Sequence, residues 1–312
     1  MVFASMKTQY FPPAPTFTEK DVGAQTGKVF IITGGNQGVG FELIKMLYPT
    51  GATVYMASRS EERAAEATKI ITSSDPSNAS RLKFLHLDLS DLNSVRSAAQ
   101  KFAKQKTRLD ILLNNAGVGG EPVGSKTKQG IELHIGVNVI APLLLTQLLH
   151  PQLRTAATSS PKASVRVIWT SSWMIECDHF NETSKRYGKD SVISVVQNPG
   201  NLQTNIYHTQ SRLMMLFVNR ILYPPKMGAY TTLFAGLSKE ITEANQGSYI
   251  IPWGRVQEIN PRKDIYEVIE KGKGKELWEW CEKQIKANRD TTNKLVVCMQ
   301  LENIEDCIAM IA

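Results

Sequence analysis

The sequence predicts a single α/β domain built on a mainly parallel, doubly wound β-sheet with helices on both faces. Two observations lead to this fold class. Short apolar runs rich in strand-forming residues alternate, six times between about residues 27 and 255, with segments whose apolar residues repeat at helical spacing. A glycine-rich turn joins the first apolar run to the first helical segment. With 312 residues and a hydrophobic content of 42%, the chain is long enough to bury one large core.

The glycine turn predicts a phosphate-binding site of the Rossmann type. Residues 29–32 form the first strand, Gly34, Gly38 and Gly40 follow it, and a helical pattern begins immediately afterwards. Glycines let the backbone approach a ligand closely, and a helix N-terminus offers unpaired N–H groups and a partial positive charge. Strand, glycine turn and helix in this order therefore predict a site for the pyrophosphate of a dinucleotide.

The second strand indicates which dinucleotide. Residues 52–57 end in Ser58-Arg59-Ser60, and a helix is expected over 61–71. An acidic residue at this strand end would accept a hydrogen bond from the ribose 2′-hydroxyl, but none is present, and the guanidinium of Arg59 can bind a 2′-phosphate. The pattern favours NADP over NAD. The alternative is an arginine that is simply solvated.

The remaining elements continue the alternation, and short polar motifs follow several strands. The Asn115-Ala116-Gly117 segment is expected to hold the sheet edge beside the cofactor through backbone hydrogen bonds, an ordinary asparagine-rich turn being the alternative. Strands are expected over 82–87, 109–113, 165–170, 192–196 and 248–253, and helices over 91–104, within 127–150 and over 275–287.

These motifs resemble those of the short-chain dehydrogenase/reductases. The resemblance rests on T-G-x-x-x-G-x-G at 33–40, N-N-A-G at 114–117, Ser172 and P-G-x-x-x-T at 199–204, and it covers about residues 27 to 255. Within that family the chain is similar to fungal reductases of secondary metabolism, close to the retinol-dehydrogenase and protochlorophyllide-reductase branch. The proline-containing arm before the first strand fits the same group.

The resemblance implies a set of site residues. Ser172 would hydrogen-bond the substrate carbonyl, although a paired serine at a strand end is also a common helix cap. Asn138 would help to hold a water molecule in the proton relay. Residues 205–240 would form a substrate lid, with a plain core helix as the alternative, and no metal is expected. The cofactor would contact Gly34, Asn36, Gln37, Gly38, Val39, Gly40, Arg59, Asp88, Leu89, Asn115, Ala116, Gly117, Pro199, Gly200, Leu202 and Thr204.

The chain departs from the family at its acid/base pair. The family uses Y-x-x-x-K, in which the lysine lies on the same helix face as the tyrosine and lowers the tyrosine pKa. None of the tyrosines here has a lysine four positions later, and the connection between Ser172 and Val192 is short for a loop, a full helix and a return to the sheet. We therefore expect the helix after the fifth strand to be shortened or missing, which would leave strand five or six partly uncovered.

Three interpretations of this departure remain open. The chain is a deleted or mis-spliced copy of an active reductase, or a pseudoenzyme that binds NADP or a partner without catalysis, or an enzyme in which Tyr187 rebuilds the pair with Lys185 or Lys189. Tyr187 is the weakest catalytic candidate because neither lysine stands four positions after it. The expected family function is NADP-dependent oxidation or reduction of a carbonyl or alcohol in a small, secondary-metabolite substrate.

The expected organisation is an arm over 1–27, an NADP-binding domain over 28–287 and a tail over 288–312. The net charge of +7 comes from scattered basic residues, which suits an anionic cofactor but lacks the basic, aromatic stripe of a nucleic-acid-binding protein. Four cysteines without C-x-x-C spacing, no signal-peptide pattern and no apolar run of membrane-spanning length favour a cytoplasmic protein without a membrane span. The oligomeric state is left open.

Overall fold

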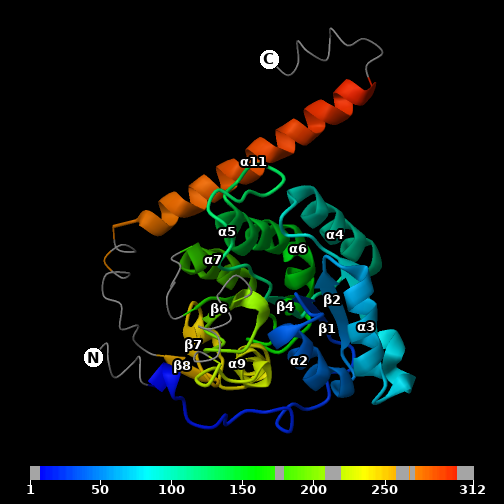
Figure 1. The fold of residues 1–312 in the computed structure, drawn as a ribbon, viewed down its shortest axis with the longest axis vertical. Helices are drawn as coiled ribbons and strands as arrows, with labels where there is room; N and C mark the ends of the chain where they lie inside the picture. The colour runs from blue at the N-terminus through cyan, green and yellow to red at the C-terminus, as the bar shows by residue number, and fades with distance from the viewer. Residues whose placement is uncertain (1–7, 173–178, 208–218, 258–266, 268–270, 301–312) are drawn as a thin grey trace.

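The computed structural model describes residues 8–172, 179–207, 219–257, 267 and 271–300, and these residues form one sheet covered by helices on both faces (Figure 1). The sheet has eight strands in the order β3-β2-β1-β4-β5-β6-β7-β8, and all neighbours are parallel except β7 and β8. The doubly wound α/β prediction is confirmed. The strands are β1 Val29–Thr33, β2 Thr53–Ser58, β3 Leu82–His86, β4 Ile111–Asn114, β5 Arg166–Thr170, β6 Ile193–Gln197, β7 Tyr249–Ile251 and β8 Arg255–Gln257.

Two hydrophobic cores lie on the two faces of the sheet. Successive residues of β1 alternate between them: Ile31 belongs to the core under α4, α6, α7 and α11, and Phe30 to the core under α2, α3 and α9. The helices are α2 Gly38–Leu47, α3 Glu61–Thr72, α4 Leu92–Gln105, α5 Leu133–Ile135, α6 Ala141–Thr158, α7 His179–Tyr187, α9 Pro225–Leu237 and α11 Lys273–Gln300, with shorter turns η1 Tyr48–Thr50, η2 Pro76–Arg81, η3 Gly136–Ile140, η4 Gly188–Asp190, η5 Asn205–Tyr207 and η6 Glu243–Asn245.

The strand order reverses between β1 and β4, and this position determines where a ligand can bind. The chain winds outward from β1 through β2 to β3, then returns to pair β4 against the other side of β1, in the register Phe30 to Ile111. In open α/β sheets a crevice forms outside the carboxyl ends of the strands at such a switch point. The loops that follow β1 and β4 therefore form the two walls of the expected site.

Strands β5 and β6 are covered, which corrects the expectation that one of them would be partly exposed. Every residue of β6 is buried, and in β5 only the terminal Thr170 is half-buried. The reason is that α7, a helix of nine residues, packs on β6 and that α11 packs on α7. The helix after the fifth strand is therefore present, and a second helix from the end of the chain reinforces that layer (Figure 1).

The antiparallel strand β8 is not predicted by the local pattern, and α11 runs across the expected boundary at 287/288. Residues 225–237, in the expected lid, form α9, whose buried residues pack on α2 and the sheet. Residues 208–218 of the expected lid and 301–312 of the expected tail lie outside the described residues, so the lid and the tail stay predictions.

One helical stretch within the described residues, Leu133–Thr158, is long and apolar enough to cross a membrane. A little over half of its apolar window, 56%, is buried inside the protein. A helix that belongs to a core passes the same test of length and composition, so this stretch is weak evidence of a span.

Candidate functional site

The glycine turn after β1 presents the N-terminus of α2 to the crevice. Gln37 precedes the helix in an extended conformation, no side chain caps the helix, and its first turn carries no acidic residue. Gly34 and Gly38 adopt positive φ angles of 68° and 58°, which only glycine accepts without strain. The first N–H groups of a ten-residue helix are thus available to a ligand, with the partial positive charge that an anion requires.

Gly40 has a different constraint from Gly38. A Cβ added at Gly40 would lie 2.6 Å from the carbonyl oxygen of Gly34 and 2.8 Å from Asn115 Nδ2, so the third glycine is needed for contact between the turn and the β4 loop. Among the residues that the structure describes, a Cβ added at Gly38 would meet only the methyl group of Thr204, at 3.8 Å. The space beside Gly38 is therefore open toward the β6 loop.

Thr33 ties the loop after β4 to the end of β1. Its hydroxyl accepts hydrogen bonds from the backbone N–H groups of Asn115 and Ala116, both at 2.9 Å, and donates to the carbonyl of Leu113. The Asn115 side chain donates to the carbonyl of Thr33 at 2.9 Å. The asparagine motif thus fixes the walls of the crevice relative to each other.

Asn138 holds the next part of the same loop. Its Oδ1 accepts from the N–H of Val118 and its Nδ2 donates to the carbonyl of Val118, both at 2.9 Å. The residue lies in η3, a single turn of π-helix between α5 and α6, and such turns occur often at functional sites. A Cβ on Gly117 would stand 3.2 Å from Asn138 Oδ1, so loop and helix are in close contact.

The loop after β6 faces the glycine turn. Asn205 Nδ2 donates to Gln37 Oε1 at 3.2 Å, across 168 positions of sequence. Leu202 and Val39 are both buried, and a Cβ on Gly228 of α9 would collide with Leu202 and lie close to Val39. The structure therefore brings the glycine turn, the asparagine loop and the P-G-x-x-x-T loop together at one edge of the sheet.

The ends of β2 and β3 lie outward from these loops. Arg59 is exposed immediately after β2, and among the residues that the structure describes its guanidinium forms no ion pair. The hydroxyl of Ser58 is buried and lacks a hydrogen-bond partner within the same residues. After β3, the Asp88 carboxylate accepts from the backbone N–H and hydroxyl of Ser90, at 3.0 and 2.7 Å, while Leu89 is buried.

Ser172 and Tyr187 occupy different ends of the sheet. The N–H of Ser171 donates to the carbonyl of Gln197, which places the Ser171-Ser172 pair beside the carboxyl end of β6. Tyr187 stands before the amino end of β6, and a strand rises about 3.3 Å per residue, so the length of β6 separates the two. The structure does not bring Tyr187 to the crevice.

The surroundings of Tyr187 are those of a core residue. Its ring is 6% exposed and stacks on His150 with centroids 4.8 Å apart. Its hydroxyl has no hydrogen-bond partner among the described residues, and burial raises its pKa above the ordinary value. Lys185 and Lys189 are exposed. A raised pKa opposes proton transfer, so the environment is unlike that of an activated tyrosine.

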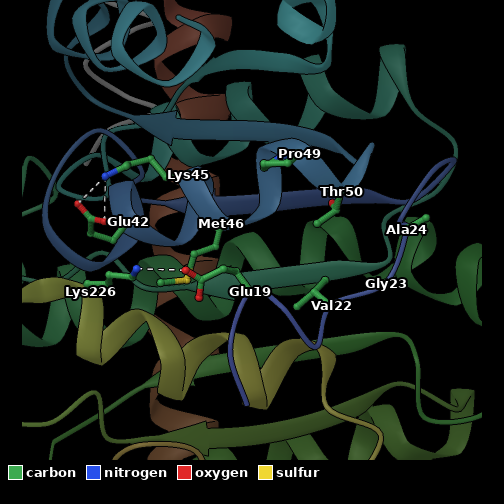
Figure 2. A pocket seen from close by; sticks show the side chains of 10 residues that line it. All are labelled: Glu19, Val22, Gly23, Ala24, Glu42, Lys45, Met46, Pro49, Thr50 and Lys226. Atoms are coloured by element: carbon green, nitrogen blue, oxygen red, sulfur yellow. Dashed lines mark hydrogen bonds and ion pairs between the residues drawn. The ribbon is translucent and has the colours of Figure 1, made fainter. Parts of the chain in front are cut away.

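A separate groove of about 550 Å³ lies between the arm, α2 and α9 (Figure 2). It is lined by the second half of α2, including Lys45 and Met46, so it is remote from the glycine turn at the start of that helix. Its charged side chains pair with each other, Glu19 with Lys226 at 3.1 Å and Glu42 with Lys45 at 3.2 Å. The groove is therefore distinct from the crevice.

Two residues that position the site, Thr33 and Asn198, are not among the site residues predicted from the sequence. Thr33 enters the sequence pattern only as part of the glycine motif, and its place directly before Gly34 at a strand end is the signal that could have found it. Asn198 Oδ1 accepts from the N–H of Gly200 at 2.9 Å, the turn that asparagine commonly forms with a residue two positions later. The sequence Asn198-Pro199-Gly200 could have revealed it.

Comparison with known proteins agrees with this architecture. The family model of the short chain dehydrogenases matches residues 28–176. The short-chain dehydrogenase/reductase iacJ of Pestalotiopsis fici is 48% identical, over 89% of this chain and 96% of the relative, and pkfC of Emericella nidulans is 37% identical, over 92% and 99%. The chain belongs to the short-chain dehydrogenase/reductase family, a family of oxidoreductases.

Solved structures share the fold at lower identity. An NADPH-bound carbonyl reductase from chicken fatty liver superposes with a TM-score of 0.59, at 20% identity, over 76% of this chain and 99% of the reductase. An uncharacterized protein from Mycobacterium paratuberculosis gives a TM-score of 0.62, at 24% identity, over 86% and 97%. At these identities the likeness concerns the fold alone.

The relatives carry internal residues that this chain lacks. The Pestalotiopsis alignment runs over 314 positions, more than the whole length of this chain, yet it takes in only 89% of the chain. A 40% identical relative from Phomopsis amygdali is aligned over 329 positions with 91% of the chain. Many aligned positions in both comparisons must therefore hold a residue of the relative and none of this chain.

Proposed function

We propose that the crevice at the carboxyl ends of β1, β4 and β6 binds NADP and that the chain descends from reductases acting on a carbonyl or alcohol of a small secondary metabolite. The observation that carries the proposal is the convergence of the glycine turn, the asparagine loop and the P-G-x-x-x-T loop at the switch point. The uncapped start of α2 and the open side of Gly38 fit a pyrophosphate.

The chain's own residues have separate tasks in this proposal. The N–H groups at the start of α2 would bind the pyrophosphate, and Arg59 with the nearby hydroxyl of Ser58 would bind the adenosine ribose and its 2′-phosphate. Asp88 and Leu89 lie at the next strand end, where the adenine would rest. NADP(H), when bound, supplies or accepts the hydride at C4 of its nicotinamide. Ser172 would orient the substrate oxygen.

A second candidate function is binding of NADP without catalysis. It is favoured by the absence of Y-x-x-x-K, by the short connection between Ser172 and Val192, and by the residues of the relatives that have no counterpart here. The placement of Tyr187 against His150 gives the third interpretation, a rebuilt acid/base pair, no support. Turnover of NADPH with a panel of ketones separates catalysis by this chain from binding of NADP without catalysis.

Arg59 provides the test of cofactor choice. Arg59→Ala should weaken NADPH binding by about 1.5–3 kcal/mol, the value of a hydrogen bond to a charged group, and should weaken NADH binding much less. The matched control is Lys69→Ala, which removes one positive charge from the exposed last turn of α3. Fluorescence titration of both cofactors measures the effect. Equal losses for NADPH and NADH would refute the assignment.

A further inference from the structure

The N-terminal arm, here residues 8–27, is docked on the body of the protein along its length. It starts beside β8, where Arg255 donates to the carbonyl of Thr8, and passes over α9 to α2 (Figure 1). Phe17 packs edge-on against Phe234 of α9, with ring centroids 6.0 Å apart. Further along, Glu19 pairs with Lys226 of α9 (Figure 2). The arm therefore contacts β8 and α9 and lines the groove beside α2.

Within this arm, Gln9 is buried and contacts the loop that faces the glycine turn. Its side chain is 7% exposed, and its Oε1 accepts a hydrogen bond from Asn198 Nδ2 at 2.8 Å, across 189 positions of sequence. Asn198 is itself 2% exposed, and its backbone N–H donates to the carbonyl of Ile250. A buried glutamine joined to a buried asparagine is a polar contact with little access to water.

The Asn198 side chain transmits this contact to the backbone of the loop. Its Nδ2 is used toward Gln9, and its Oδ1 accepts from the N–H of Gly200 at 2.9 Å. If the amide turned over, a donor would face the N–H of Gly200 and an acceptor would face Gln9 Oε1, and both bonds would be lost. The acceptor of Gln9 and the N–H of Gly200 therefore favour the same orientation of the Asn198 amide.

Gly200 fixes the course of the loop. It has a positive φ of 90°, and an added Cβ would lie 2.7 Å from the Trp253 ring, so the turn is closely packed at this point. From Gly200 the loop leads to Leu202 and Thr204, which approach Val39 and Gly38 of the glycine turn. A shift at Gly200 would consequently move the residues of the β6 loop that face the glycine turn.

We propose that Gln9 is a positioning residue for the cofactor loop: through Asn198 it holds Gly200 and so sets the 199–204 backbone in the form that binds NADP. The proposal rests on the proposed function, since it assumes that this loop contacts the cofactor. The effect acts through Asn198, and Gln9 does not touch the cofactor. It gives the arm a role in the affinity of the site.

The test compares variants that keep or remove the acceptor. Gln9→Met preserves the length of the side chain without an acceptor, and Gln9→Ala removes the acceptor without adding bulk. Glu19→Gln is the control, because it weakens a different contact of the arm. Thermal unfolding establishes which variants are folded. Hydrogen exchange of 199–204 in the ligand-free protein and the Kd for NADPH are then measured.

Gln9→Met and Gln9→Ala should speed exchange at Gly200 and raise the Kd for NADPH about tenfold, as expected for one buried bond left unmade. Glu19→Gln should resemble the unmodified protein. Unchanged exchange and affinity in the folded acceptor-free variants, or equal losses in Glu19→Gln, would overturn the positioning role. If the unmodified chain fails to bind NADPH, the proposed function fails, while the exchange of Gly200 still decides whether Gln9 holds the loop.

Discussion

The glycines of the first turn are constrained for different physical reasons, and single substitutions should separate them. Gly38 has open space beside it but a φ of 58°, whereas a Cβ on Gly40 would collide with Gly34 and Asn115. A left-handed conformation costs a non-glycine residue about 1–2 kcal/mol, and overpacking a filled site costs about 1–3 kcal/mol. The two positions therefore contribute differently to binding and to stability.

Gly38→Ala should lose most of its NADPH affinity with only a modest fall in melting temperature, since the new methyl group would enter the space proposed for the pyrophosphate. Gly40→Ala should lose stability first, because it separates the turn from the β4 loop. Calorimetric titration and thermal unfolding of both variants measure the contrast. An unchanged affinity in Gly38→Ala would show that no phosphate lies beside that residue.

At the scale of elements, the layer over β6 depends on α11. Trp278 of α11 is 2% exposed, and the guanidinium of Arg186 in α7 lies over its ring at 4.5 Å. Cys281 and Ile285, on the same helix, are also buried, and Arg96 of α4 donates to the carbonyl of Ile285 at 3.1 Å. Helix α11 thus adds to the layer over β6, which the short helix α7 alone would cover incompletely.

Trp278→Ala should destabilise the protein by about 3–5 kcal/mol, the usual cost of truncating a buried tryptophan, because α7 would lose the surface that covers it. Trp280→Ala is the matched control on the same helix: that side chain is 40% exposed and its loss should cost little. Denaturant unfolding of both variants measures the difference. Equal, small effects would mean that α11 does not contribute to the core.

Local sequence patterns predict the elements in which consecutive residues are apolar and buried. The strands up to β6 are recognisable because most are buried on both faces, so their sequences are continuous apolar runs. Strand β8 and the cover given by α11 are not, since β8 is short and half-buried and the α11 contact joins segments far apart in the sequence. The glycine and asparagine loops are predictable as motifs, whereas the bond from Gln9 to Asn198 has no local signal.

The whole molecule combines a well-formed cofactor crevice with a short connection after Ser172. The loops of the crevice are fixed by hydrogen bonds and close packing at Thr33, Asn138 and Asn198. In contrast, the relatives contain internal residues that have no counterpart in this chain. The chain also lacks Y-x-x-x-K, and its 173–191 connection is short. Cofactor binding and catalysis should therefore be separable in this chain.

The chain as it stands should bind NADPH yet show little or no reductase activity. General acid–base catalysis contributes roughly 10²–10⁴ in rate, and a misplaced nicotinamide can cost about 100-fold more. Restoring a family-length segment between Ile175 and Lys185, with a tyrosine and a lysine four positions apart, should raise turnover by several orders of magnitude. The same graft with phenylalanine in place of that tyrosine is the control and should stay near the starting rate. If the unmodified chain instead reduces a ketone at about 10 per second, a typical enzymatic rate, the short connection does not prevent catalysis and Tyr187→Phe becomes the decisive variant.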